Sequence, residues 1–143
     1  MIDRRKFILD SCKACAGMLA IAGTASFISS CSTLDVLKIS PVNKVMVVNL
    51  KSLKEGVNRY ILRSSGLDYD ILLVLHQHAK PEALLMKCTH IDNPLVATNS
   101  GLACNMHGSR FDFDGKVTNG PAARPLNRFV TEKNENEIKI FLT

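Results

Sequence analysis

The sequence predicts an all-β domain that follows a separate N-terminal segment. After residue 41, short apolar or alternating stretches recur, and Gly, Asn, Asp and Pro residues separate them. This spacing is typical of short strands joined by turns. After residue 30 the chain shows neither a long amphipathic helical pattern nor an internal repeat. With 143 residues, it is long enough for one small domain.

Four strands are expected in the first half of this domain. Residues 45–50 and 60–63 are apolar stretches of strand length. Residues 70–78 contain the longest apolar stretch of the domain, ILLVL, followed by His76 and His78. Residues 83–88 follow a proline and end at a cysteine. We interpret His76 and His78 as solvated strand residues rather than as metal ligands.

Three further strands are expected at residues 101–104, 110–113 and 138–142. Asp112 and Asp114 precede a glycine, a pattern that predicts a hairpin turn rather than a pair of catalytic carboxylates. The polar residues 133–137 predict a turn before the last strand.

Two short segments supply candidate metal ligands. One reads Cys88-Thr89-His90 and the other Cys104-Asn105-Met106-His107, so each contains one sulfur and one imidazole ligand. Thiolates and imidazoles together suit zinc or iron-sulfur centres rather than magnesium or calcium. They fit a Cys2His2 zinc site, and they also fit a [2Fe-2S] centre in which two Cys hold one iron and two His hold the other. The ligand types alone leave both metals open.

The residues after the second segment indicate which metal is bound. They read Gly108-Ser109-Arg110-Phe111-Asp112, then Gly115-Lys116-Val117, then Gly120-Pro121-Ala122-Ala123-Arg124-Pro125-Leu126. Together with the two ligand segments, and in this order, they resemble the Rieske iron-sulfur family over roughly residues 40–142. The resemblance implies a Rieske-type antiparallel β-sandwich with a small cluster-binding subdomain near residues 86–126. It also implies a [2Fe-2S] cluster as the cofactor.

The same resemblance assigns a role to each ligand. It implies that Cys88 and Cys104 bind the buried iron, and that His90 and His107 bind the outer iron with their imidazole edges near solvent. Electrons would enter and leave through this histidine edge.

Four further residues lie beside the ligands in this comparison: Gly108, Ser109, Phe111 and Pro121. Pro121 belongs to residues 120–125, a loop that the resemblance implies shields the cluster from water. Ser109 keeps a hydroxyl that donates to a cluster sulfur in high-potential members, whereas Phe111 stands where those members have a Tyr that donates to a ligand sulfur. Such bonds stabilise the more negative reduced cluster. We therefore expect a potential within about −150 to +300 mV, below that of the quinol-oxidising members.

The chain departs from the respiratory branch of the family in its cysteines. That branch has an extra Cys in each ligand segment, joined as a disulfide, where this chain has Asn93 and Met106. Of the other cysteines, Cys12 and Cys15 lie in the N-terminal segment and Cys31 directly follows it. None remains to form a disulfide, so the loops must be held by packing.

Residues 1–30 predict an export signal. Arg4 and Arg5 begin a stretch that resembles a twin-arginine signal, which exports folded proteins. The stretch FISSC resembles a bacterial lipobox with Cys31 as the lipidated residue, so we expect residues 31–41 to be a lipidated tether and residues 42–143 to be the domain. The apolar run of residues 14–30 is shorter than the about 20 residues that span a bilayer, which disfavours the alternative of a retained anchor helix. We expect a membrane-anchored protein on the periplasmic side.

Charge and length narrow the function further. The formal net charge is +5, but no basic run with interleaved aromatics indicates nucleic-acid binding. Oxygenases of the family add a catalytic domain, for which this sequence has no residues left. We therefore expect an electron carrier or redox subunit rather than an enzyme, exchanging single electrons with redox protein partners at a membrane. A zinc-stabilised extracytoplasmic binding module without redox activity is the alternative.

Overall fold

The computed structural model of the chain describes residues 34–142. Within them it is almost entirely β, which confirms the predicted class. The segment predicted as an export signal, and Cys31, lie outside the described residues. In chain order the elements are β1 (Asp35–Lys38), β2 (Val45–Asn49), the 3-10 helix η1 (Leu50–Ser52), β3 (Arg59–Arg63), β4 (Ile71–Val74), β5 (Glu82–Leu85), β6 (Val96–Thr98), β7 (Gly101–Ala103), β8 (Arg110–Phe111), β9 (Val117–Asn119), β10 (Arg128–Lys133) and β11 (Glu137–Phe141).

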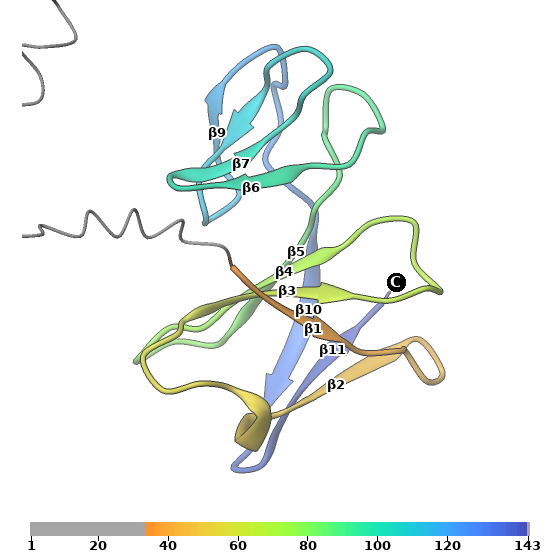
Figure 1. The fold of residues 1–143 in the computed structure, drawn as a ribbon, viewed down its shortest axis with the longest axis vertical. Helices are drawn as coiled ribbons and strands as arrows, with labels where there is room; N and C mark the ends of the chain where they lie inside the picture. The colour runs from red at the N-terminus through yellow and green to blue at the C-terminus, as the bar shows by residue number, and fades with distance from the viewer. Residues whose placement is uncertain (1–33, 143) are drawn as a thin grey trace, which may run out of the picture. The chain divides into compact units, whose positions relative to one another are not determined.

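Seven strands form one sheet, here called the base sheet, in the order β1-β3-β4-β5-β10-β11-β2. Its neighbours are antiparallel except β1 and β3, which pair in parallel. The edge strands β1 and β2 are joined only by residues 39–44, and Val42 bridges to Val45 to make a tight turn. So short a connection cannot cross a flat sheet whose strands lie about 4.8 Å apart. The base sheet is therefore strongly curled (Figure 1).

The other four strands form the small sheet, in the order β6-β7-β8-β9, with each pair antiparallel. The chain leaves the base sheet after β5 and returns to it at β10, which pairs with β5. Figure 1 shows the small sheet as a separate layer beside the base sheet. The two candidate ligand segments lie in the loops of this inserted part, between β5 and β6 and between β7 and β8.

Strand β4 contributes to two apolar cores. Leu72 and Val74 belong to the core that the two sheets share, together with Leu102 of the small sheet. Ile71 and Leu73 belong to the second core, which is built from the base sheet. Each of the four β4 side chains is at most 5% exposed. A strand that is buried on both faces has a continuous run of apolar residues instead of alternating apolar and polar residues. This accounts for the ILLV sequence of β4.

The placement of two predicted segments was wrong. Residues 31–41 were expected to be a tether, but Asp35–Lys38 form β1, whose Leu37 packs against the base-sheet core. The alternation in β1 is only four residues long, which made its strand signal weak. The strand expected over residues 70–78 is shorter, because β4 ends at Val74. His76 and His78 therefore lie in the connection to β5 rather than in a strand.

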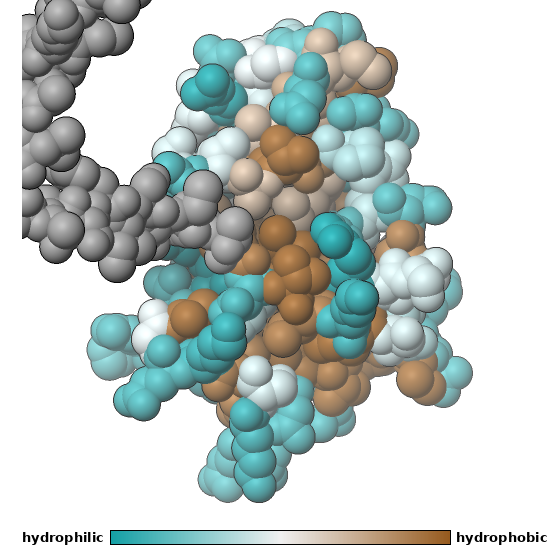
Figure 2. Space-filling model, in the orientation of Figure 1, coloured by the Kyte–Doolittle hydropathy of each residue, from teal (hydrophilic) through white to brown (hydrophobic). Residues whose placement is uncertain are grey.

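Strands β6, β9 and β10, and the parallel pairing of β1 with β3, were not predicted. On the face shown in Figure 2, most of the apolar surface lies over the base sheet, surrounded by hydrophilic residues. Exposed valines in or next to base-sheet strands include Val36, Val42, Val47 and Val130. Ile91 and Met106 are exposed as well, in the two ligand loops.

Candidate metal centre

Two loops present the predicted ligands. Residues 86–95 join β5 to β6, and a bridge between Lys87 and Pro94 closes them into a narrow loop. Residues 104–109 join β7 to β8, and the backbone N–H of Cys104 donates to the carbonyl of Ser109 at 2.8 Å. Gly108 has a φ of +78°, in the left-handed region that favours glycine. Its N–H donates to the carbonyl of Cys104 at 3.0 Å, which completes the second turn.

The four predicted ligands divide into a buried pair and an exposed pair. Cys88 and Cys104 are 1% and 2% exposed and belong to the core shared by the two sheets. His90 and His107 are exposed, and their ring centroids lie 5.2 Å apart with an angle of 81° between the ring planes. Sulfur therefore lies on the inner side of the centre and imidazole on the outer side.

Hydrogen bonds around Cys88 favour its thiolate. Burial by itself raises the pKa of the Cys88 thiol. Bonds from the backbone of Ile91 and His90, and from the side chains of Cys104 and Ser109, outweigh burial and lower the pKa below its ordinary value. Cys88 and Cys104 both belong to the core shared by the two sheets. The thiolate is the form of cysteine that binds metals.

Residues 120–125 contact both ligand loops. The backbone N–H of Ala122 donates to Ser109 Oγ at 3.0 Å, and Thr89 Oγ1 donates to the carbonyl of Arg124 at 2.6 Å. Directly before this segment, Asn119 Nδ2 donates to the carbonyls of Gly108 and Gly120, both at 3.0 Å. Sequence reasoning missed the roles of Thr89 and Asn119, because each bond depends on segments that meet only in the fold.

The predicted neighbours of the ligands have different environments. Ser109 is completely buried, and Phe111 is 1% exposed in the shared core. Pro121 and Met106 are exposed. Asn93 is half-buried, and its side chain contacts the sulfur of Cys104.

Other polar clusters lie apart from these loops. Asp112 Oδ1 accepts from the backbone N–H groups of Asp114 and Lys116 at 3.0 and 2.8 Å, as expected for a turn. His76 and His78 line a different pocket with Asn58, and the buried Nε2 of His76 has no partner among the described residues.

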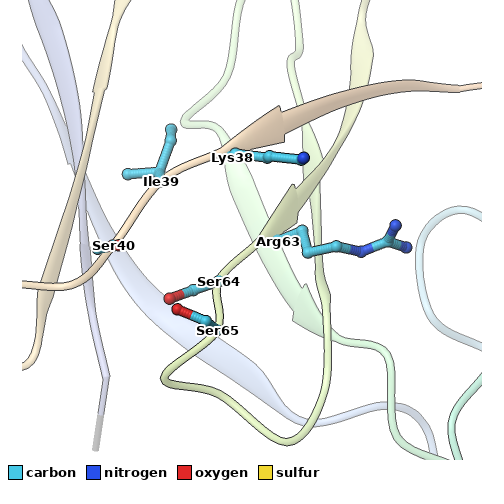
Figure 3. Close-up of a pocket in the computed structure, with 6 residues that line it drawn as sticks. All are labelled: Lys38, Ile39, Ser40, Arg63, Ser64 and Ser65. Atoms are coloured by element: carbon cyan, nitrogen blue, oxygen red, sulfur yellow. The ribbon is translucent and has the colours of Figure 1, made fainter.

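Another pocket lies at the ends of β1 and β3. It is lined by Lys38, Ile39, Ser40, Arg63, Ser64 and Ser65. Figure 3 shows the side chains of Lys38 and Arg63 extending away from the serine hydroxyls. Arg63 is already paired with Asp70 at 2.6 Å. The pocket contains none of the predicted ligands.

The donor set fits a two-iron cluster. Two adjacent buried thiols and two neighbouring exposed imidazoles match a [2Fe-2S] centre in which Cys and His bind different irons. Within residues 34–142, no group of three or more His, Cys, Asp or Glu side chains lies in an arrangement that could hold a metal ion.

The all-β fold, the buried cysteine pair and the exposed histidine pair together fit an iron-sulfur protein. Comparison with known families identifies the branch, because the model of the Rieske [2Fe-2S] domain matches residues 43–130. The chain belongs to the Rieske family, and its cofactor is a [2Fe-2S] cluster.

Two known proteins show the extent of the similarity. The chain is 23% identical over 129 residues to the cytochrome b6-f complex iron-sulfur subunit of Chlorobaculum tepidum. This alignment covers 84% of this chain and 70% of the relative. The crystal structure of the plasma membrane Rieske protein PetC3 from Synechocystis PCC 6803 has a TM-score of 0.50 and 24% identity. The superposition covers 65% of this chain and 97% of that protein, and it supports the fold assignment. Between residues 34 and 142, the structure contains no helix that is both long and apolar enough to cross a bilayer.

Proposed function

We propose that this protein transfers single electrons through its [2Fe-2S] cluster, bound by Cys88, His90, Cys104 and His107. The proposal rests on the separation of a buried cysteine pair from an exposed histidine pair. When bound, the cluster accepts and releases one electron, which no protein side chain here could supply. The family match and the relative named as an iron-sulfur subunit support the role of an electron carrier or redox subunit rather than of a complete enzyme.

The protein residues around the cluster have distinct tasks in this proposal. Cys88 and Cys104 would hold one iron on the side of the apolar shared core, which excludes water from that side. His90 and His107 would hold the other iron on the exposed side, so that a partner has to approach only the imidazole edges. Residues 120–125 fix both loops through Thr89 and Ser109, which limits movement of the ligands between oxidation states.

The surface beside the histidines suits a protein partner. Ile91, next to His90, is 42% exposed, and Met106, next to His107, is 58% exposed. Exposed apolar side chains of this size are enriched where proteins contact one another. We propose a redox protein as donor and another as acceptor, both docking at this edge. The relative from Chlorobaculum tepidum is named as a subunit of a cytochrome complex, which supports an assembly with redox partners.

We further propose that the protein is exported and held at the membrane on the periplasmic side. Arg4 and Arg5 support twin-arginine export, and Cys31 supports lipidation, with residues 42–143 as the Rieske domain. PetC3 is described as a plasma membrane Rieske protein, which favours a membrane location for this chain as well. Intact-mass measurement of the protein from a bacterial membrane fraction tests this directly. Cleavage before Cys31 with an added acyl mass is expected, whereas an unprocessed N-terminus would contradict lipidation.

Electron paramagnetic resonance tests the proposed function. The full chain, produced in a host that assembles iron-sulfur clusters, is measured before and after reduction with dithionite. We expect a silent oxidised sample, a Rieske-type signal on reduction, and two irons per chain. A redox-silent protein with one zinc per chain and no iron, from cells with adequate iron supply, would overturn the proposal in favour of the zinc-stabilised binding module.

A further inference from the structure

Asn93 connects the two ligand loops. Its backbone belongs to the first loop, where its carbonyl accepts from the N–H of Cys88 at 2.9 Å and its own N–H donates to the carbonyl of Ile91 at 2.6 Å. Its side chain reaches the second loop, where Nδ2 donates to the sulfur of Cys104 at 3.8 Å. One residue is therefore bonded to both cysteine-bearing loops.

The contacts of the Asn93 amide leave one sensible orientation for it. Nδ2 carries two hydrogens, and it contacts two acceptors: the sulfur of Cys104 and the carbonyl of Pro94 at 3.2 Å. A flipped amide would place its oxygen against two acceptors, with no hydrogen between them. The donor orientation satisfies both neighbours, and it becomes more favourable when Cys104 is a thiolate.

The location of this bond makes it sensitive to charge. Cys104 is 2% exposed and Asn93 is half-buried, so water screens the N–H···S contact poorly. Adding an electron to the cluster increases the negative charge on its sulfur ligands. A hydrogen bond donated to a ligand sulfur is therefore stronger in the reduced state, and it raises the reduction potential.

We infer that Asn93 is a positioning residue that joins the two ligand loops without a covalent bond and raises the potential of the cluster through Cys104. This inference rests on the proposed role of Cys104 as a cluster ligand. It assigns a function to a position at which a loop-joining disulfide is absent, and it supplies a hydrogen bond to sulfur in a chain where Phe111 lacks a hydroxyl.

The experiment compares variants of the full chain by redox titration monitored by electron paramagnetic resonance. Asn93→Leu removes the donor at similar size. Asn93→Asp keeps the shape but places a carboxylate against the sulfur, and Asn93→Gln keeps an amide donor. Thr98→Val is the matched control, because Thr98 Oγ1 donates to the carbonyl of Gly101 within the small sheet, outside both ligand loops.

We expect the midpoint potential to fall in Asn93→Leu, to fall further in Asn93→Asp, and to lie closer to the wild type in Asn93→Gln. Thr98→Val should lower the thermal stability of the protein without a comparable shift in potential. Equal potentials for the wild type and for Asn93→Leu or Asn93→Asp would overturn the inference. Loss of the cluster from all three Asn93 variants, with the cluster retained in Thr98→Val, would overturn the tuning of the potential and leave a purely structural role.

The wild-type sample separates this inference from the proposed function. If the wild type shows no Rieske-type signal, the proposed function fails before any variant is compared. If the wild type shows the signal and only the order of the variants is wrong, the proposed function stands and the role of Asn93 is rejected.

Discussion

The base sheet and the small sheet are stabilised in different ways. Strands of the base sheet have four to six residues and surround an apolar core of side chains that are fully buried. Strands of the small sheet have only two or three residues. Its loops depend on side chains such as Thr89, Ser109 and Asn119, which bond to backbone groups of other loops.

This difference indicates how a metal centre is accommodated in so small a domain. The base sheet surrounds its own core of fully buried apolar side chains, which stabilise it by the hydrophobic effect. The small sheet shares one core with the base sheet, and two cysteine ligands form part of that core. We therefore expect metal binding to contribute to the folding of the small sheet more than to that of the base sheet.

The largest expected effect comes from Cys104→Ser. Removing this ligand should abolish the cluster and its signal in the reduced state, and it should increase hydrogen exchange in β6 to β9 far more than in the base sheet. Hydrogen exchange followed by mass spectrometry measures both regions in one sample. Met106→Ala, in the same loop but 58% exposed, is the control and should retain the cluster. A fully loaded Cys104→Ser protein would contradict the assignment.

Two neighbouring residues of β4 provide a sharper comparison. Leu72 and Leu73 are both fully buried, but Leu72 faces the shared core and Leu73 the base-sheet core. Each change to Ala should cost about 2–5 kcal/mol of unfolding free energy. Only Leu72→Ala should also accelerate cluster release, measured by the decay of visible absorbance in a chelator. Equal release rates would show that the two cores are not independent.

Gly101→Ala should destabilise the small sheet by about 1–3 kcal/mol or more, as overpacking does. Gly101 has a φ of +154°, and an added Cβ would lie 2.0 Å from the backbone oxygen of Phe111. A backbone oxygen cannot move aside as a flexible side chain can, so β7 and β8 would have to separate. Denaturant unfolding measures the loss of stability. Gly66→Ala is the control, because its nearest neighbour, Ser64 Oγ, would lie 3.7 Å away.

The smallest expected effect is a change in the reduction potential of the cluster in Phe111→Tyr. Phe111→Tyr adds a hydroxyl to a ring that is 1% exposed in the shared core. If it donates to a ligand sulfur, a bond of about 1 kcal/mol corresponds to a rise of about 40 mV for a one-electron couple. Redox titration measures the rise, and an unchanged or lower midpoint would show that position 111 does not tune the cluster.

Local patterns predicted much of the base sheet and the candidate ligands. Apolar stretches at residues 45–50 and 60–63 correspond to β2 and β3, because a buried strand carries its signal in its own residues. The Cys and His segments were evident for the same reason, since each ligand pair lies within one short loop. Strands β1, β6 and β9 were missed because none of them contains a fully buried residue, so their apolar signal is weak. Strand β10 alternates between half-buried and exposed residues, so its apolar signal is weak.

By itself, the sequence predicted the all-β class through its short apolar stretches, and the resemblance of its ordered motifs to the Rieske family implied the family and the [2Fe-2S] cofactor, because these signals are carried by local residue patterns. Only the tertiary structure decided that β1 pairs in parallel with β3, that β4 is buried on both faces, and that Asn93 reaches Cys104. These features depend on which distant segments become neighbours. Chain connectivity and the burial of two separate cores select those neighbours, and no single stretch of sequence encodes them.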